Sequence, residues 1–329
     1  MRTEDTTKTI DAAIQAAVWA PSVHNTQPWS FAVDGEEIAL RADSDRKLRV
    51  GDITGREQLI SCGAALENMR IALRAMGREA PVRVLPDPDR PALLATVRLG
   101  EPVEADEHTL MLYGQVERRR THRAGFTDQP IPDRLLGELT QQAAVEGARL
   151  TPIRSLPAVR VLAALTEAAQ EVQAQATLFT LDVIRWGRAP ESGRTDGVPA
   201  GAYPREPVAT EPAFPQRDYA HGRPWGGEAD RLTATSTGLI AVLTTLADSR
   251  EDWIAAGRAL QRVLLHAGAH GVRAAFHTQS LEMLHLREFA RQELLSGEYP
   301  QMIMRLGFTP DEGIGVRRPL DEVREDTGA

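Results

Sequence analysis

The residues of this chain best suited to chemistry lie in a short loop near the N-terminus, bounded by Pro21 and Pro28. The polar side chains of the loop are Ser22, His24, Asn25 and Gln27. Proline fixes its own backbone and pushes the preceding residue out of the helical region, so we expect a rigid, extended, non-helical loop. Short donors and acceptors on a stiff loop suit the polar edge of a flat heterocycle. The alternative is a structured turn whose polar groups cap the neighbouring elements.

A second candidate is a run of basic residues at 118–123, together with two arginines near the C-terminus. The arginines of these two segments are Arg118, Arg119, Arg120, Arg123, Arg317 and Arg318. Guanidinium groups present forked donors that match the oxygens of a phosphate group. A solvated, charged face is the alternative for the 118–123 run, and the run alone leaves both interpretations open.

Other residues that could do chemistry give weaker indications of a functional site. His266 and His270 are four residues apart on an expected helix and, with His277, could suggest a zinc site, but no glutamate follows His266 as in His-Glu-x-x-His. Capping or core histidines are therefore favoured. Cys62 occupies an apolar helix face and is interpreted as a buried, inert thiol. Neither the Gly-x-Gly-x-x-Gly pattern nor a Gly-x-Ser-x-Gly elbow around Ser22 occurs.

Composition restricts the class of protein. The 329 residues exceed a typical module of ~100–150 residues and fit two domains or two fused halves. A net charge of −8 argues against nucleic acid or an anionic membrane as the main partner. No apolar run reaches the ~20 residues of a membrane helix, the N-terminus lacks a signal-peptide layout, and one cysteine cannot form an internal disulfide. We therefore expect a cytoplasmic protein.

Hydrophobic periodicity predicts the elements that position the loop in the first part of the chain, up to about residue 108. Helices are expected over 10–19 and 57–76, the second ending at Gly77. Strands are expected over 29–33, 38–41, 82–85 and 93–99. The polar loop therefore joins a helix to a strand in an α+β half.

The second part of the chain is also expected to mix helices and strands. Its expected helices are 107–116, 132–146, 157–183, 252–269 and 281–295, and its expected strands are 239–246 and 301–307. An insert rich in proline and glycine, with scattered aromatic side chains, runs from about 187 to 227. A connection of this length inside a compact protein is usually functional or disordered.

Two motifs together resemble the nitroreductase family of flavoproteins. Residues 20–31 read Ala-Pro-Ser-Val-His-Asn-Thr-Gln-Pro-Trp-Ser-Phe, and residues 119–126 contain Arg-Arg-Thr-x-Arg-x-x-Phe. Further matches are residues 52–57, 61–66, 300–307 and 317–323. In ordinary members the arginine motif comes first, whereas here the order is reversed and spread over two halves. This arrangement resembles the Acg subfamily of NAD(P)H nitroreductases over about residues 8–325.

The resemblance implies an α+β, nitroreductase-like fold made of two homologous halves in one chain, which form an internal pseudo-dimer. Each half would have a central antiparallel sheet flanked by helices. The N-terminal half would span 1–108, and the C-terminal half 109–329 would carry the insert at about 187–227 as a lid. One complete FMN site would survive between the halves. The chain would then be a monomer, or a weak homodimer, that acts on a small molecule without nucleic acid or membrane partners.

The resemblance also implies which residues bind the cofactor. They are Ser22, His24, Asn25, Gln27, Pro28, Arg119, Arg120, Thr121, Arg123, Arg317 and Arg318. Because a flavin performs the chemistry itself, no protein residue is expected to be catalytic. The implied function is that of an FMN-dependent oxidoreductase that passes hydride from NAD(P)H or a metabolite to a small acceptor. The alternatives are an FMN-sequestering protein without turnover and a specialised biosynthetic flavin dehydrogenase.

Overall fold

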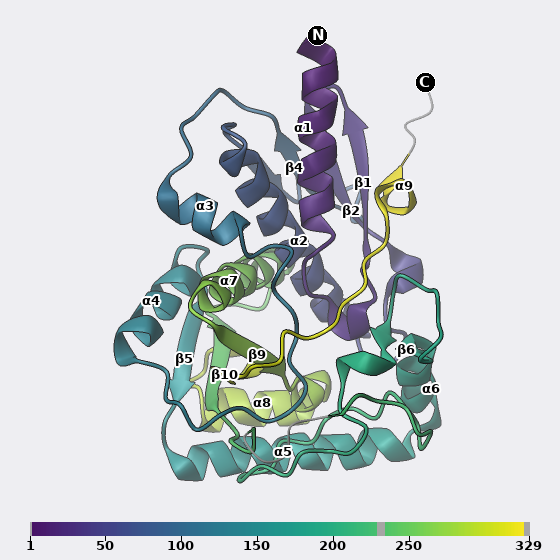
Figure 1. Cartoon of the computed structure of the whole chain (residues 1–329), viewed down its shortest axis with the longest axis vertical. Coiled ribbons are helices and arrows are strands. Elements are labelled where there is room, and N and C mark those ends of the chain that lie inside the picture. The colour runs from purple at the N-terminus through teal and green to yellow at the C-terminus, as the bar shows by residue number, and fades with distance from the viewer. Residues whose placement is uncertain (1, 229–233, 326–329) are drawn as a thin grey trace.

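The computed structural model describes residues 2–228 and 234–325. Two main β-sheets lie at opposite sides of a central pair of long helices, α2 (Arg56–Ala75) and α7 (Arg250–Ala269) (Figure 1). Helix α2 packs on the first sheet and α7 on the second, and the two helices pack on each other. The central pair therefore joins the two sheets into one body.

The first sheet is built mainly from the N-terminal part of the chain. Its strands, in spatial order, are β11 (Arg324–Glu325), β1 (Trp29–Asp34), β2 (Glu37–Ala42), β4 (Leu93–Arg98) and β3 (Val82–Val84). All neighbouring pairs are antiparallel except β1 and β11, which are parallel. The edge strand β11 comes from the far end of the chain, so the C-terminal segment completes the N-terminal sheet.

The second sheet is antiparallel throughout. Its strands, in spatial order, are β5 (Arg149–Ile153), β8 (Leu239–Thr245), β10 (Tyr299–Phe308) and β9 (Val272–Phe276). Strand β8 reads Leu-Ile-Ala-Val-Leu-Thr-Thr and is buried along almost its whole length, as expected for a strand covered on both faces.

The other helices cover these sheets and the central pair. They are α1 (Arg2–Ala17), α3 (Glu107–Tyr113), α4 (Asp133–Ala144), α5 (Leu156–Gln175), α6 (Thr177–Trp186), α8 (Leu284–Glu293) and the short α9 (Leu320–Val323). Helix α1 packs on α2, and α4 packs on α7. These contacts bury two large apolar clusters, one around α2 and the first sheet and one around α7 and the second sheet.

Two glycines allow α2 and α7 to cross at close range. A Cβ atom built on Gly63 of α2 would lie 2.2 Å from the backbone oxygen of Ile254, and one on Gly257 of α7 would lie 2.0 Å from that of Ile60. Real Cβ atoms do not approach this closely, so only glycine fits at either position. The relation is reciprocal, because each helix presents its glycine to the backbone of the other.

The insert and the C-terminal segment both return toward the loop that follows α1. The insert begins with the parallel strands β6 (Gly187–Arg188) and β7 (Val198–Pro199). Its aromatic residues Tyr203, Phe214 and Tyr219 are buried, so it is packed onto the body of the molecule. The C-terminal segment runs from the second sheet, past this loop, to α9 and β11 beside β1 (Figure 1).

The mixed α/β content expected from the sequence is confirmed, with several local differences. The helix expected over 157–183 is divided into α5 and α6, because Ala176 is extended (φ −89°, ψ 104°). Strands β5, β9 and β11 were not anticipated. None of the helices in the described part of the chain combines the length and apolar character that crossing a bilayer requires.

Candidate functional site

The loop after α1 has an unusual backbone. A short 3-10 turn spans Val23–Asn25, and His24, Asn25 and Gln27 adopt φ values of 46°, 54° and 51°. Side chains rarely tolerate this left-handed region, and such strain is often held at functional sites. The expectation of an extended loop is therefore wrong. The turn is held by Ser22, whose backbone oxygen accepts from Asn25 N (3.0 Å) and whose Oγ accepts from Gln27 N (2.9 Å).

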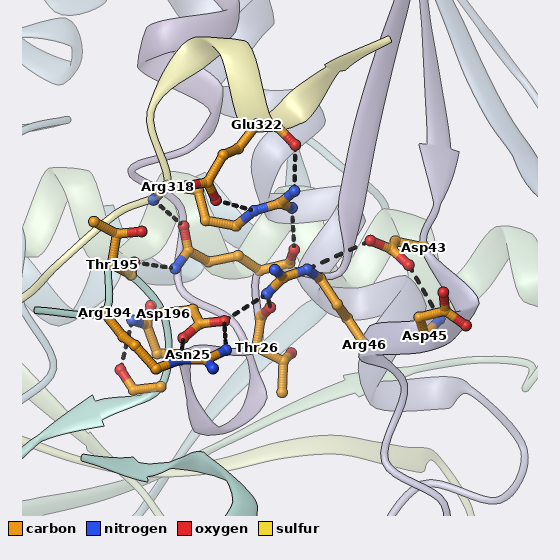
Figure 2. Close-up of polar contacts among 12 residues, drawn as sticks. Asn25, Thr26, Asp43, Asp45, Arg46, Arg194, Thr195, Asp196, Arg318 and Glu322 are labelled. Atoms are coloured by element: carbon orange, nitrogen blue, oxygen red, sulfur yellow. Dashed lines mark hydrogen bonds and ion pairs between the residues drawn. The ribbon is translucent and has the colours of Figure 1, made fainter. Parts of the chain in front are cut away.

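The two amide side chains of the loop hold the insert and the C-terminal segment. Asn25 Nδ2 donates to the backbone oxygens of Gly197 (2.8 Å) and Val316 (3.2 Å). Gln27 is fully buried, with Nε2 donating to the backbone oxygen of Thr195 (2.9 Å) and Oε1 accepting from Arg318 N (2.8 Å). Three segments distant in sequence thus meet at this loop (Figure 2).

A buried ionic cluster fixes the start of the insert beside this meeting point. Asp196 accepts hydrogen bonds from Arg46 (3.0 Å) and Arg194 (2.9 Å) (Figure 2). It also accepts one from Arg188 (2.8 Å). Burial by itself raises the pKa of Asp196, but the hydrogen bonds from these arginines outweigh it and hold that pKa well below its usual value. Asp196 is therefore ionised, and it ties the insert to the N-terminal part of the chain through Arg46.

The larger of two adjoining pockets lies between this loop, the central helices and the insert. Its apolar lining comes from the central helices and the second sheet: Ile60, Leu260, Phe276 and Met302. Its polar lining includes Ser22, His24, Glu57, Thr121, Arg123, Arg217, Tyr219 and Thr278. We call this space the broad pocket.

The second pocket is lined by arginines and is called the arginine pocket below. Arg120, Arg123 and Arg317 line it, together with Asn25. The two pockets share four lining residues: Pro21, Ser22, Thr121 and Arg123. The two pockets therefore adjoin one another.

The arginine pocket carries uncompensated positive charge. Arg119 lines neither pocket but is buried close to Arg120 and Arg123; its Nη2 donates to the backbone oxygen of Trp19 (3.1 Å), while Nε and Nη1 have no partner. Arg317 Nε is likewise buried without a partner. In the described part of the chain, Arg119, Arg120, Arg123 and Arg317 form no ion pair with a carboxylate.

The positive charges of these four arginines affect one another's pKa values. Burial and then the charges of neighbouring arginines lower the pKa of Arg119 to about 9 and hold the pKa of Arg317 well below its usual value. Both groups remain cations at neutral pH. An anion placed among them would remove the repulsion and satisfy the unpartnered donors.

In the broad pocket, His24 is neutral and paired with the insert. Its Nδ1 lies 2.9 Å from the hydroxyl of Tyr219, and its Nε2 is buried without a partner. Burial, followed by the charges of Arg217 and Arg123, holds the pKa of His24 well below its usual value. The neutral ring therefore joins the loop to the insert and leaves one polar nitrogen for a ligand.

The structure brings together most, but not all, of the residues anticipated for the site. Ser22, Thr121 and Arg123 line both pockets, His24 lines the broad one, and Asn25, Arg120 and Arg317 line the arginine one. Four other candidates line neither pocket: Gln27, Pro28, Arg119 and Arg318. Pro28 has its backbone oxygen near Cys62 Sγ (3.3 Å), and Arg318 directs its guanidinium to backbone oxygens, including that of Trp29 (3.3 Å).

Several pocket residues were missed by sequence reasoning. Glu57 follows Arg56 at the start of α2, in a segment already matched by resemblance, and its buried Oε2 has no partner. Arg217 of the insert forms a buried ion pair with Glu282 and is also within reach of Thr278 Oγ1 (3.5 Å). The pairing of a charged insert residue with a distant acidic one leaves no local pattern in the sequence.

Comparison with known proteins identifies relatives over nearly the whole chain. No family model matches it. The Mycobacterium tuberculosis H37Rv protein named "Putative NAD(P)H nitroreductase Rv3131" is 33% identical over 324 residues, which cover 97% of this chain and 91% of that protein. "Putative NAD(P)H nitroreductase acg" from the same strain is 28% identical over 326 residues, covering 97% and 96%.

Solved structures give weaker similarities. The FMN-dependent nitroreductase NfnB from Mycobacterium smegmatis, in complex with NADPH, aligns with a TM-score of 0.41 and 15% identity, covering 67% of this chain and 99% of that one. A nitroreductase in complex with FMN from Desulfovibrio desulfuricans aligns with a TM-score of 0.36 and 15% identity, covering 64% and 93%. Superpositions at these scores carry no argument for the site.

Proposed function

This chain belongs to the nitroreductase family of its Mycobacterium tuberculosis relatives, and on that premise we propose that it is an FMN-dependent oxidoreductase. The observation that carries the proposal is the arginine pocket joined to the broad pocket. FMN has a dianionic phosphate at one end and a flat, mixed polar and apolar ring at the other. The arginine pocket matches the phosphate end of FMN, and the broad pocket matches its ring end.

The phosphate end fits the residues present. Arg120, Arg123 and Arg317 line a small pocket without a carboxylate counter-ion among the described residues, and buried Arg119 adds a fourth charge close to them. Forked guanidinium donors bind phosphate oxygens in pairs. The unpartnered Nε of Arg317, a residue that lines the pocket, is a donor that a phosphate oxygen could satisfy.

The ring end fits in the same way. Apolar side chains from α2, α7 and the second sheet offer one face for a flat ring, and the loop and insert offer polar groups. The unpartnered His24 Nε2 and Glu57 Oε2 are available to polar atoms of the ring. In this proposal Asn25 and Gln27 act by fixing the loop, because their side-chain amides are bonded to the insert and the C-terminal segment.

When bound, FMN supplies the hydride and electron transfer. The chain's own residues position it and control access to it. The arginines hold the phosphate, the strained loop orients the polar edge of the site, and the insert excludes water from the broad pocket. We propose NAD(P)H or a metabolite as hydride donor and a small molecule as acceptor.

The cofactor proposal is tested by releasing the flavin from denatured protein and by reconstituting variants of the arginine pocket. The released flavin should be FMN and not FAD. Arg120→Ala and Arg123→Ala should each weaken FMN binding about 10- to 100-fold, because a charge-assisted hydrogen bond contributes roughly 1.5–3 kcal/mol. Arg118→Ala is the matched control, since Arg118 is exposed and lines neither pocket.

Two results would contradict the proposal. One is a protein that contains FAD or that cannot be reconstituted with FMN. The other is equal retention of FMN by the Arg118, Arg120 and Arg123 variants, which would mean that the arginine pocket does not hold the phosphate.

We further propose that the two parts of the chain, 1–108 and 109–329, act as counterparts of two subunits in an internal pseudo-dimer. Each part contributes a largely antiparallel sheet and one long central helix, and the reciprocal Gly63 and Gly257 contacts support a symmetric relation. The site draws residues from both parts. Such a chain would be complete as a monomer, or at most a weak homodimer.

A second candidate function, storage or sequestration of FMN without turnover, is favoured by one observation. Gln216, Arg217 and Tyr219 of the insert line the broad pocket, so this segment forms part of its wall. We propose that the insert is a lid, and a closed lid would keep nicotinamide away from the flavin. Anaerobic mixing of the yellow protein with NADPH separates the two functions, because bleaching requires hydride transfer from NADPH to the flavin. A specialised dehydrogenase would instead be bleached only by its own substrate.

A further inference from the structure

A cluster of ligating side chains lies away from both pockets, at the C-terminal end of α7. Glu138 of α4, His266 of α7 and His270, which directly follows α7, each offer one ligand atom, and the three atoms all lie within 4.8 Å of one another. His266 Nε2 is 3.2 Å from Glu138 Oε2. His277, the third histidine considered from the sequence, lies elsewhere and accepts from Arg305 Nε (2.8 Å).

The second ring nitrogens of both histidines are already engaged. His270 Nδ1 lies 3.0 Å from the backbone oxygen of His266, and a carbonyl only accepts, so this nitrogen carries the proton. His270 Nε2 therefore presents a lone pair. His266 Nδ1 lies 3.3 Å from His108 Nε2 of α3. When His266 Nδ1 donates to His108, zinc can replace the proton that otherwise joins His266 Nε2 to Glu138 Oε2, and that proton is released to solvent. Metal-bound histidines are usually oriented in this way, by a hydrogen bond from the other nitrogen.

We propose that Glu138, His266 and His270 form a zinc site, with water as the fourth ligand. His108 would orient His266 through the contact with its Nδ1. Two imidazole nitrogens and a carboxylate oxygen are typical zinc ligands. Bonds of ~2.0–2.2 Å at tetrahedral angles place neighbouring ligand atoms roughly 3.3–3.6 Å apart, close to the spacing of His266 and Glu138. His270 is exposed at the end of its helix, so its ring can move the remaining distance.

The site would cross-link three helices. Glu138 belongs to α4, His266 to α7 and His108 to α3, and His270 caps the C-terminus of α7. Arg134 donates to the other carboxylate oxygen, Glu138 Oε1 (3.0 Å), and so orients Oε2 toward the histidines. Zinc bound here would stabilise the packing of α3 and α4 on α7, independently of any cofactor in the pockets.

The test is a calorimetric titration of tag-free, flavin-loaded protein with ZnCl₂ in a non-chelating buffer, alongside thermal unfolding with zinc and with EDTA. The wild type should bind one equivalent and unfold at a higher temperature with zinc. His270→Ala and Glu138→Gln should lose both effects while unfolding like the wild type in EDTA. His108→Phe should bind about 10- to 100-fold more weakly, as expected for loss of the residue that orients His266.

His285→Ala is the matched control, because His285 is an exposed histidine on α8 and should not alter zinc binding. The proposal is overturned if the wild type takes up no stoichiometric zinc. It is equally overturned if His270→Ala and Glu138→Gln bind zinc like the control. Failure of this proposal would leave the flavin proposal untouched, because the two sites share no residue.

Discussion

Glu57 places a carboxyl group in the broad pocket at the start of α2. Its Oε1 lies 3.1 Å from Arg56 Nη2, and its Oε2 is buried and unpartnered. Burial, with the nearby charges of Glu282 and Asp52, raises the pKa of Glu57 to about 8, and the attraction of Arg56 only partly opposes this. A substantial fraction of the Glu57 side chains is therefore protonated at neutral pH.

This protonation predicts a pH dependence of stability. Between its usual pKa of 4.5 and about 8, folded Glu57 holds a proton that the unfolded chain releases. The free energy of unfolding should therefore fall as pH rises through that window and level off above it. Glu57→Gln keeps the neutral shape and should be more stable than wild type at pH 8 by on the order of 1–3 kcal/mol, with little difference near pH 5. Urea denaturation at both pH values, in the same flavin state, checks this.

An equal difference between wild type and Glu57→Gln at the two pH values would contradict the prediction. It would mean that Glu57 is ionised in the folded protein throughout, held by Arg56. Glu138→Gln is a useful comparison, because the pKa of that half-buried carboxyl is lowered, chiefly by a hydrogen bond from Arg134.

Among the contacts between elements, the crossing of α2 and α7 is tightly constrained by a glycine on each helix. Gly257→Ala would bring a Cβ atom against the backbone of α2, and a helix backbone cannot move away alone. We expect a loss of about 1–3 kcal/mol, as for other overpacked cores. Gly137→Ala on the exposed face of α4 is the control, because a Cβ there meets nothing within 4 Å. It should gain about 0.5–1 kcal/mol from helix propensity.

Chemical denaturation of both glycine variants measures this difference. The two substitutions are chemically identical, so opposite signs isolate the helix crossing as the cause. A neutral Gly257→Ala would show that the two helices can separate without cost, and it would weaken the case for a fixed arrangement of the two halves.

The insert offers a second prediction at this scale. Tyr219→Phe removes the hydroxyl partner of His24 Nδ1 and leaves a buried ring nitrogen unsatisfied, at a cost of about 1–3 kcal/mol. Tyr203→Phe is the control, because the buried hydroxyl of Tyr203 has no partner. Limited proteolysis within 187–227 should be faster for Tyr219→Phe than for wild type, and unchanged for Tyr203→Phe. Equal rates for all three would show that this bond does not hold the insert.

The elements that could be predicted from the sequence are those with a long, regular pattern. The apolar spacing of 57–76 predicted α2 within one residue, and Gly77 follows it with the expected left-handed φ of 77°. Strand β11 has two residues and pairs with a strand nearly 300 positions away in the chain, so no local signal marks it. The left-handed turn at His24 was hidden by the flanking prolines, whose own geometry favours an extended chain.

The residues of the site likewise divide into those that could be predicted from a local sequence pattern and those that could not. The arginines of 119–123 could be anticipated because a charged motif is visible locally, and Arg317 because it recurs in a basic ending. Glu57, Arg217 and Thr278 could not, because their place in the pocket depends on how three distant segments are packed. Whether each candidate contacts a cofactor remains a prediction.

At the scale of the whole molecule, the two halves should not fold separately. Helix α2 is buried on most of its surface, in part against α7, and β1 would lose its neighbour β11. A fragment of residues 1–108 should therefore lack a cooperative unfolding transition, whereas co-expression with 109–329 should restore a folded complex. Thermal unfolding followed by circular dichroism, with the intact chain as control, checks this. A fragment that unfolds cooperatively alone would contradict it.

The course of the C-terminal segment has a consequence for biosynthesis. Ile314, Gly315 and Arg317 line the arginine pocket, and they follow every other residue of that pocket along the chain. Because a ribosome makes the chain from its N-terminus, the central helices and the strands from β1 to β10 are made before these residues, whereas β11 follows them. An anion that needs Arg317 can be captured only after that residue has emerged from the ribosome, so loading of the site follows synthesis of all the other residues of that pocket.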